Sequence, residues 1–159
     1  MFFCRSMSIS VKFKNRINDL VDEVINQRNL KRSALPKLMK VDYSSLTNAL
    51  EYGIIPTPRI AIRMANFFKC SIPYLLGESD DEYFLPSQKG ETFEDRINLL
   101  CAENNTDHTK VNKECNFNRG YLTRWVKNHY IPRWEFLDIL ADHFHVSIDF
   151  LLGRTDDRN

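Results

Sequence analysis

The sequence lacks an excess of charge of either sign, and it lacks long hydrophobic runs. Its 159 residues contain 22 Lys and Arg against 21 Asp and Glu, which gives a formal net charge of +1. This balance does not by itself indicate a nucleic acid or a membrane surface as partner, so charge has to be compared segment by segment. No run approaches the roughly 18 apolar residues of a membrane-spanning helix, and we expect no membrane contact.

Cysteine is sparse as well. The chain has four, and no Cys-x-x-Cys pair occurs among Cys4, Cys70, Cys101 and Cys115. A disulfide framework in a short secreted chain usually shows denser, paired spacing, so these residues are expected to be reduced thiols. The first ten residues, MFFCRSMSIS, lack the apolar stretch of a signal peptide. Both features predict a cytoplasmic protein.

Catalytic patterns are absent too. The sequence has no phosphate-binding glycine loop, no His-Glu-x-x-His pair and no serine elbow. His143 and His145 lie two apart at an expected helix end, where their side chains point in different directions and make a poor metal pair. Cys101 and Cys115 fall at apolar helix positions, which favours a place in the core. We therefore predict no enzyme activity, no metal or other cofactor, and no small-molecule substrate.

The sequence does contain an internal repeat. SIPYLLGESDD at residues 71–81 returns as SIDFLLGRTDD at residues 147–157. An offset of 76 aligns residues 30–81 with residues 106–157 without a gap, and the matches fall largely on apolar and turn positions. Upstream the offset becomes 80, so the first copy carries four additional residues around the end of its first helix. The pattern predicts two copies of one unit.

Each copy is predicted to form five short helices, because apolar residues recur with helical spacing and no β-type alternation occurs. The first helix has one apolar stripe, which consists of Phe13, Ile17, Leu20, Val21 and Val24. The third helix is expected at residues 42–51 in the first copy and at residues 118–127 in the second. The predicted domains are residues 8–79 and residues 92–157.

Helix starts are predicted from capping residues and prolines. In the first copy Ser33 is expected to cap the second helix, with Pro36 in its first turn, where no backbone donor is lost. In the second copy Asp107 is the better cap. Pro58 and Pro132 are expected to open the fourth helix of each copy.

The fifth helix and the linker complete the predicted organisation. Ser71 and Ser147 are expected to cap the fifth helix, and Gly77 and Gly153 to end it. The linker at residues 80–91 is polar at both ends with an apolar middle. A connection of some 15 residues can extend to about 50 Å, so its length permits two separated binding units.

Five short helices, of which the second and third are joined by a tight turn, resemble the helix-turn-helix domain of the phage-repressor and Cro-like family (the xenobiotic response element type). In the second copy the pattern runs without a gap from Arg96 through TDHTKVNKECNFNRGYLTRWVKNHYIP to SIDFLLGRTDD, and in the first copy from Leu30 onward. The resemblance implies an all-α chain of two tandem five-helix, lambda-repressor-like domains. It also implies a DNA-binding regulator from a phage or other mobile element.

Two positions depart from the family pattern. The family usually has Gly in the turn before helix three, where the backbone tends to need a positive φ. Here Asn116 tolerates that conformation well, and Lys40 does so less readily. The family's Gln near the start of helix two, often a phosphate contact, is Arg32 in the first copy and His108 in the second. The resemblance implies phosphate contacts from both residues.

The third helix of the second copy, NRGYLTRWVK, has a face suited to a DNA major groove. Its apolar face consists of Tyr121, Leu122, Trp125 and Val126. The candidate DNA-binding residues of this segment are Asn118, Arg119, Thr123, Arg124 and Lys127. Arg can fork onto the O6 and N7 atoms of guanine. Between residues 107 and 133, six basic residues stand against two acidic ones. The alternative interpretation is an ordinary solvated helix face.

The third helix of the first copy, DYSSLTNALE, has no basic side chain on its outer face. The expected outward residues are Tyr43, Ser44, Thr47 and Asn48. Asn48 could pair with adenine N6 and N7, and Ser44 or Thr47 could contact a phosphate or a thymine methyl. The alternative is that this face binds protein or nothing.

These observations favour a sequence-specific, repressor-like transcriptional regulator that binds double-stranded DNA with helix three of one or both copies. Half-sites one helical turn apart require recognition helices about 34 Å apart. Because the two reading faces differ, one chain that binds both half-sites would require a non-palindromic site. Alternatively, a homodimer formed by the first copy would restore a palindromic site by two-fold symmetry. The alternative function is a protein-interaction module on the same scaffold, such as an antirepressor or an inhibitor of a host protein.

Overall fold

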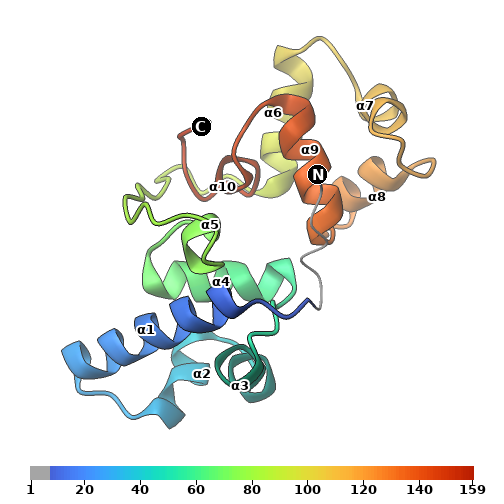
Figure 1. Cartoon of the computed structure of the whole chain (residues 1–159). Helices are drawn as coiled ribbons and strands as arrows, with labels where there is room; N and C mark the ends of the chain where they lie inside the picture. The colour runs from blue at the N-terminus through green and yellow to red at the C-terminus, as the bar shows by residue number, and fades with distance from the viewer. Residues whose placement is uncertain (1–7) are drawn as a thin grey trace. The chain divides into compact units, whose positions relative to one another are not determined.

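A computed structural model describes residues 8–159 of the chain, and these residues form an all-α protein (Figure 1). No strand occurs among them, and extended pairing is limited to two isolated bridges, Ile9 with Ile54 and Pro86 with Thr155. The chain divides into two compact units. Their described parts are residues 8–84, the N-terminal unit, and residues 85–159, the C-terminal unit.

The N-terminal unit consists of α1 (Val11–Arg28), the 3₁₀ turn η1 (Arg32–Ala34), α2 (Leu35–Met39), α3 (Tyr43–Tyr52), α4 (Pro58–Phe68) and α5 (Ile72–Leu75). Its helices bury one face each, and α1 packs against both α3 and α5. The stripe predicted on α1 is fully buried at Phe13, Ile17 and Val21. Leu20 and Val24 are half-buried at its margin.

The C-terminal unit consists of α6 (Phe93–Glu103), α7 (His108–Glu114), α8 (Tyr121–Lys127), α9 (Trp134–Phe144) and α10 (Ile148–Leu151). Thr92 and Asp95 form a capping box at the start of α6, in which each side chain bonds to the backbone N–H of the other residue. Asp107 caps α7 as predicted, because its carboxylate accepts a hydrogen bond from Lys110 N at 2.8 Å. The side chain of Trp134 is fully buried in the core.

The ends of the fifth helices also follow the prediction. The hydroxyl of Ser71 accepts a hydrogen bond from Tyr74 N at 3.1 Å, and that of Ser147 accepts one from Phe150 N at 3.0 Å. Just beyond the two helices, Gly77 has φ +72° and Gly153 has φ +73°, a region that favours glycine. The first helix is longer in the N-terminal unit, with 18 residues in α1 and 11 in α6, which is the direction that the change of offset predicts.

Three predicted helix starts are wrong. Ser33 does not cap α2, because it lies inside η1; α2 begins at Leu35, and Pro36 does lie in its first turn. Pro132 does not open α9, which begins at Trp134 after Arg133. The third helix of the second copy begins at Tyr121 rather than at residue 118. In the first case a 3₁₀ turn takes over the role expected of a capping side chain.

Hydrogen bonds hold the segment between the units at both of its ends. On one side, Arg16 donates to the carbonyl of Ser79 at 3.0 Å and to the carboxylate of Asp80 at 2.8 Å. On the other side, the Thr155 hydroxyl donates to the Leu85 carbonyl at 2.8 Å. Only residues 81–84 lie between these anchors, and four residues extend to about 14 Å.

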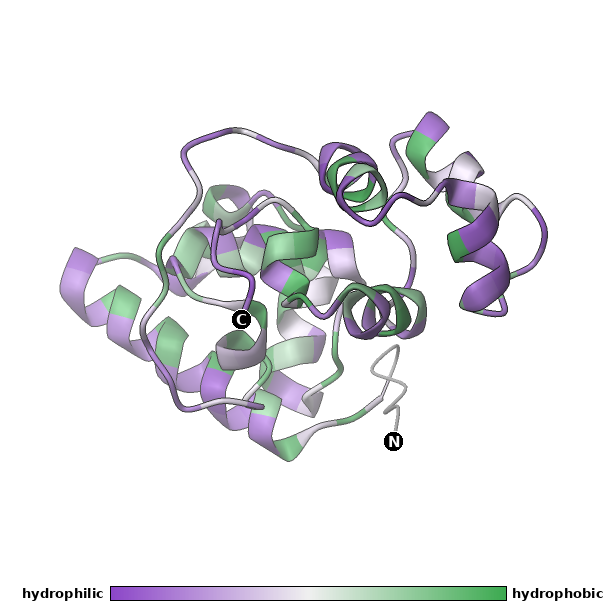
Figure 2. Ribbon diagram, turned by 90° about the horizontal axis from the view of Figure 1, so that it is seen from above, coloured by the Kyte–Doolittle hydropathy of each residue, from purple (hydrophilic) through white to green (hydrophobic). Residues whose placement is uncertain are grey.

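Hydrophobic and hydrophilic residues alternate along the helices (Figure 2), as expected for helices with one buried face. Across the described residues, none of the helices combines the length and the apolar character that a membrane span needs.

Candidate nucleic-acid interface

The turn between α7 and α8 is held together by one buried amide. Asn112, which is 6% exposed, donates from Nδ2 to the carbonyls of Phe117 at 3.2 Å and Asn118 at 2.9 Å. Its Oδ1 accepts a hydrogen bond from Leu122 N at 3.0 Å. All three bonds join one side chain of α7 to the turn and to the first residues of α8. The orientation of α8 relative to α7 therefore depends on Asn112.

The turn also has the backbone conformation that the resemblance implies. Asn116 has φ +57°, and Lys40, at the same place in the N-terminal unit, has φ +60°. Lys40 thus adopts the left-handed region although its side chain disfavours it. Gly120, directly before α8, has φ +79°, and a Cβ built there would have no neighbour within 4 Å. The backbone at Gly120 is therefore open to close approach by a ligand.

The start of α8 at Tyr121 changes the position of two predicted residues. Asn118 and Arg119 lie in the turn before the helix and not on its face. Both are exposed, and the Asn118 side chain donates to the Tyr121 hydroxyl at 2.9 Å. Arg119 and Asn118 therefore project from the entrance of α8, on a backbone whose direction the glycine sets.

α8 separates apolar and polar side chains. Leu122 and Trp125 are buried, whereas Thr123, Arg124 and Lys127 are exposed. The Arg124 guanidinium lies 5.5 Å from the centre of the Tyr121 ring, and it donates to the carbonyl of Arg119 at 3.4 Å. Both contacts are weak and leave most donors of the Arg124 guanidinium available.

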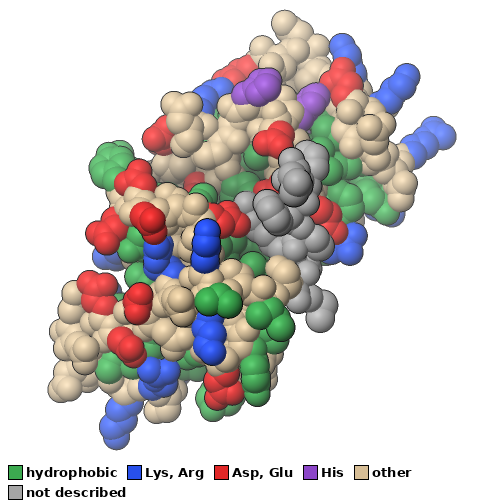
Figure 3. Space-filling model, viewed as in Figure 1, with side chains coloured by type: hydrophobic (Ala, Val, Ile, Leu, Met, Phe, Trp, Pro, Cys, Tyr) green, Lys and Arg blue, Asp and Glu red, His purple; other side chains and the backbone are tan. Residues whose placement is uncertain are grey.

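Five exposed basic side chains surround α7 and α8, and we call them the basic ridge: Lys110, Lys113, Arg119, Arg124 and Lys127. Figure 3 shows Lys and Arg side chains projecting over this part of the molecule. None of the five forms an ion pair with any residue in the range 8–159. The two acids of the segment are engaged elsewhere, since Asp107 caps α7 and Glu114 lies 3.4 Å from His143. The basic ridge is therefore a local excess of positive charge.

His108 is placed less favourably for a phosphate. It is the first residue of α7 and is half-buried, and its Nε2 lies 2.9 Å from Oδ1 of Asn98 on α6. This hydrogen bond engages one ring nitrogen of the residue for which the resemblance implies a phosphate contact.

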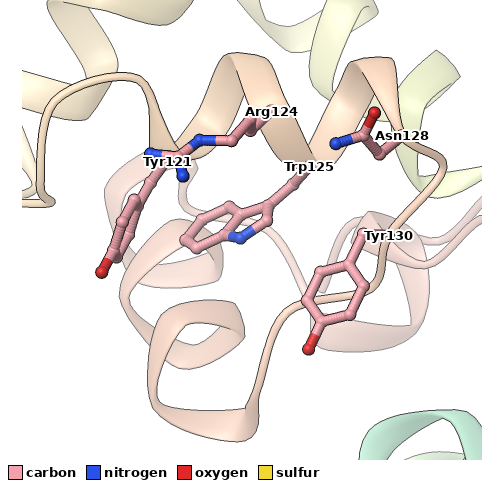
Figure 4. A pocket seen from close by; sticks show the side chains of 5 residues that line it. All are labelled: Tyr121, Arg124, Trp125, Asn128 and Tyr130. Carbon is pink, nitrogen blue, oxygen red and sulfur yellow. The ribbon is translucent and has the colours of Figure 1, made fainter.

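A shallow pocket of about 250 Å³ lies beside α8, lined by Tyr121, Arg124, Trp125, Asn128 and Tyr130 (Figure 4). Aromatic packing forms its inner wall, where the Trp125 ring centre lies 5.5 Å from that of Phe117 and 5.0 Å from that of Phe136. Trp125 is in the core as expected. The sequence did not identify Asn128, since it lies beyond the helical pattern.

The corresponding face of the N-terminal unit has different chemistry. Tyr43 is 71% exposed and Ser44 is exposed, but Thr47 and Asn48 are half-buried, so the prediction that all four point outward is wrong for the last two. α3 packs against α1, and Thr47 lines a groove together with residues of η1 and α2. A groove of about 230 Å³ runs here, with Leu46 and Leu50 in its floor.

Arg32 lines the same groove, and its guanidinium pairs with the Asp22 carboxylate at 3.0 Å. Both side chains are exposed, so the pair is weak, but it offsets the positive charge expected to meet a phosphate. At the start of α3, the Ser45 side chain donates a hydrogen bond to Asp42 and lowers the pKa of that carboxyl group. A negative charge therefore persists at the entrance of α3.

The cysteine and histidine side chains among residues 8–159 form no reactive cluster, and Cys4 lies outside the described residues. Cys101 and Cys115 are buried free thiols, and burial raises the pKa of Cys115 to about 11. A thiol with this pKa is protonated and unreactive at neutral pH. Among residues 8–159 no three His, Cys, Asp or Glu side chains come together in a way that could hold a metal ion.

Comparison of the chain with protein-family models, with curated proteins and with solved structures finds no match in any of the three.

Proposed function

We propose that this protein is a sequence-specific, repressor-like transcriptional regulator that binds double-stranded DNA through the C-terminal unit, with α8 in the major groove. The observation that carries the proposal is the basic ridge, five exposed cations without an acidic partner around a short exposed helix. A positive patch of this kind attracts the phosphate backbone whatever the sequence, while side chains on the inserted helix distinguish the bases.

The positions of the side chains in the basic ridge support different roles for them, with some contacting bases and others contacting phosphates. Arg119 and Arg124 are the candidates for guanine O6 and N7, because they project from the entrance and the exposed face of α8. Thr123 lies between them and can contact a base edge or a thymine methyl. Lys110 and Lys113 on α7, and Lys127 at the end of α8, are better suited to phosphates.

The internal repeat supports assigning DNA to the C-terminal unit. With the offset of 76, Arg119 corresponds to Tyr43, Arg124 to Asn48, and Lys127 to Glu51. The N-terminal unit thus replaces three cations of the basic ridge by two neutral side chains and one acid. Its corresponding face has little electrostatic attraction for phosphates.

The finer architecture belongs to the same proposal. We infer that the two units are tandem five-helix helix-turn-helix domains of the phage-repressor and Cro-like type, on the repeat, the tight turns with positive φ and the order of the helices. The same resemblance favours a phage or other mobile element as the source, and the sparse, unpaired cysteines favour the cytoplasm as the location. Two chains related by a two-fold axis would present two α8 helices to a palindromic site.

Binding of labelled duplexes selected from a random pool, measured across a salt series, tests the proposal. Arg124→Ala is expected to weaken binding by about 1–3 kcal/mol and to relax preference at one base pair. Lys127→Ala is expected to weaken binding to all sequences and to reduce the salt slope by about 1. Arg59→Ala, which removes an exposed arginine of α4, is the matched control.

The proposal is wrong if no duplex is enriched from the pool, or if the binding curve of Arg124→Ala equals that of the wild type. Loss of affinity without any change of base preference would leave Arg124 as a phosphate contact only. The reading role would then pass to Arg119 and Thr123, which separate alanine variants can test.

A second function, a protein-interaction module such as an antirepressor or an inhibitor of a host protein, is favoured by the groove of the N-terminal unit. This groove has apolar floor residues and the exposed ring of Tyr43 at its rim, the type of surface on which protein partners bury aromatic anchors. Asn48→Ala is the discriminating variant. It leaves duplex binding unchanged if the groove binds protein, and weakens it if α3 reads bases.

A further inference from the structure

Trp125 is buried in the core, yet its one polar atom faces outward. The residue is 8% exposed, and no atom of residues 8–159 accepts a hydrogen bond from its indole N–H. In Figure 4 the indole nitrogen lies on the edge of the ring that faces Tyr130, at the pocket beside α8. Buried tryptophans usually satisfy this donor within the protein, so an open one at a pocket points to an external acceptor.

The other polar groups of the pocket are open in the same way. In the described part of the chain, the Asn128 side-chain amide and the hydroxyl of Tyr130, a residue 49% exposed, have no hydrogen-bond partner. The Arg124 guanidinium crosses the rim toward Tyr121. No carboxylate lines the pocket, so donors outnumber acceptors and one of the donors is a cation. Such a set suits an anion with several oxygen atoms and disfavours a cation.

We propose that this pocket binds one phosphate group, with the Trp125 N–H as its inner donor and the Tyr130 hydroxyl and the Asn128 amide at its rim. The inference rests on the proposed function, in which the phosphate belongs to the DNA strand next to α8. A volume of about 250 Å³ accommodates a phosphate together with part of a sugar. The rigid aromatic wall holds the indole donor in place before the ligand arrives, which limits the loss of conformational entropy.

The chemistry of the donors predicts an unusual dependence on salt. Lysine contacts to DNA weaken as salt rises, because each one displaces condensed counterions. The donors of Trp125, Tyr130 and Asn128 are neutral, so removing one should lower affinity by the same factor at every salt concentration. This parallel shift separates the pocket from the basic ridge, where Lys127→Ala changes the slope.

The first experiment follows the indole resonances in ¹H–¹⁵N spectra. The chain has two tryptophans, and Trp134 is fully buried, so its indole peak is an internal control. Addition of a selected duplex is expected to move the Trp125 peak downfield and to leave the Trp134 peak in place. A second arm adds inorganic phosphate alone, which distinguishes a free anion from a strand phosphate as the source.

The second experiment measures duplex affinity with minimal variants. Tyr130→Phe removes one hydroxyl and is expected to weaken binding about ten- to a hundredfold, as for other hydrogen bonds to a charged group. Tyr83→Phe, which removes the hydroxyl of an exposed tyrosine in the segment between the units, is the matched control. Duplexes in which one phosphate is replaced by a neutral methylphosphonate should identify the contacted phosphate. At that single position, the replacement should weaken binding by the wild type more than it weakens binding by the Tyr130→Phe variant.

The outcomes separate this inference from the proposed function. If a duplex binds but the Trp125 peak does not move, or Tyr130→Phe binds like the wild type, the phosphate pocket is refuted and the DNA function stands. If no duplex binds but inorganic phosphate moves the Trp125 peak, and Tyr130→Phe abolishes that shift, the pocket stands and the DNA function fails. If no duplex binds and inorganic phosphate leaves the Trp125 peak in place, both proposals fail.

Discussion

At the residue scale, the charged and polar side chains that matter most are those that the core does not use. Arg119, Arg124 and Lys127 remain exposed without acidic partners. In contrast, Arg96 on α6 is fully buried and pairs with Glu91 at 2.7 Å and with Asp156 at 2.8 Å. Arginines of one small unit thus serve two purposes, one in ion pairs of the interior and the other at the surface.

Asn112 gives a prediction at this scale. Asn112→Ala removes three hydrogen bonds and leaves the Phe117 and Asn118 carbonyls and the Leu122 N–H without this partner, so the unit is expected to lose about 1–3 kcal/mol of stability. Both tryptophans lie in the C-terminal unit, so tryptophan fluorescence during urea unfolding reports on this unit. Asn98→Ala, at an exposed position with one bond to His108, is the control and should change stability little.

Alanine substitutions at two glycines with similar φ are expected to reduce stability by different amounts. An alanine at Gly120 has no neighbour within 4 Å, so Gly120→Ala should cost only the strain of a positive φ, about 1–2 kcal/mol. An alanine at Gly153 would collide with the Glu91 carbonyl, whose carbon would lie 2.8 Å from the new Cβ. Gly153→Ala is expected to lose about 1–3 kcal/mol more than Gly120→Ala in the same fluorescence assay. Equal losses would contradict this account.

At the element scale, short helices are positioned by what lies at their ends. α8 has only seven residues, and a helix of this length is marginal in isolation. Gly120 before α8 and the amide of Asn112 under it supply the orientation that its own length does not. The same principle applies to the entry segment of the C-terminal unit, residues 85–92, which has no helix and depends on side-chain anchors.

Asp156 is the main anchor of that entry segment. Its carboxylate accepts hydrogen bonds from the Ser87 hydroxyl at 2.9 Å and from Arg96 at 2.8 Å, and these bonds lower its pKa. A lowered pKa in the folded state stabilises the unit above the unfolded pKa, about 3.9, and the contribution is lost as pH falls through the folded value. Asp156→Asn should therefore lower the melting temperature at neutral pH.

The difference between Asp156→Asn and the wild type should shrink as the pH falls below about 4, because the wild-type carboxylate is then protonated as well. Thermal unfolding followed by tryptophan fluorescence at several pH values measures this difference in melting temperature. Asp142→Asn, at an exposed position of α9, is the control. A difference that stays constant with pH would mean that shape, and not charge, makes Asp156 important.

Helix starts show how far the sequence alone can predict elements. Asp107, Ser71 and Ser147 cap helices as predicted, because the capping bond joins residues three apart in the sequence. Ser33 has the same chemistry, but the chain around it forms η1 instead. Pro132 precedes its helix by two residues, since proline at this distance fits an extended approach as well as a first turn.

At the scale of the whole molecule, the number of residues between the anchors of the two units limits what the units can do together. Residues 81–84 are all that separates the anchors at Asp80 and Leu85. Two binding units on so short a connection would have a high effective concentration relative to each other. A longer connection is therefore a direct test of whether one or both units bind DNA.

Inserting ten Gly and Ser residues between Tyr83 and Phe84 lengthens that segment from four to fourteen residues. If both units bound one duplex, the loss of effective concentration would weaken binding about sixfold. We expect a change of less than about twofold, because the N-terminal unit lacks the cations of the basic ridge. Affinity for a long selected duplex, compared with that of the unmodified chain, measures the effect. A sixfold loss would assign DNA to both units.

The sequence by itself determined the helical class of the chain, the apolar stripe of α1 and several helix ends. These follow from the period of apolar residues and from bonds between neighbours, which need no distant contact. The tertiary structure decided that Asn118 and Arg119 precede α8, that Thr47 and Asn48 are half-buried, and that Trp125 has an open donor. Each of these features depends on which residues far apart in the chain pack against one another, and local sequence patterns do not specify such contacts directly.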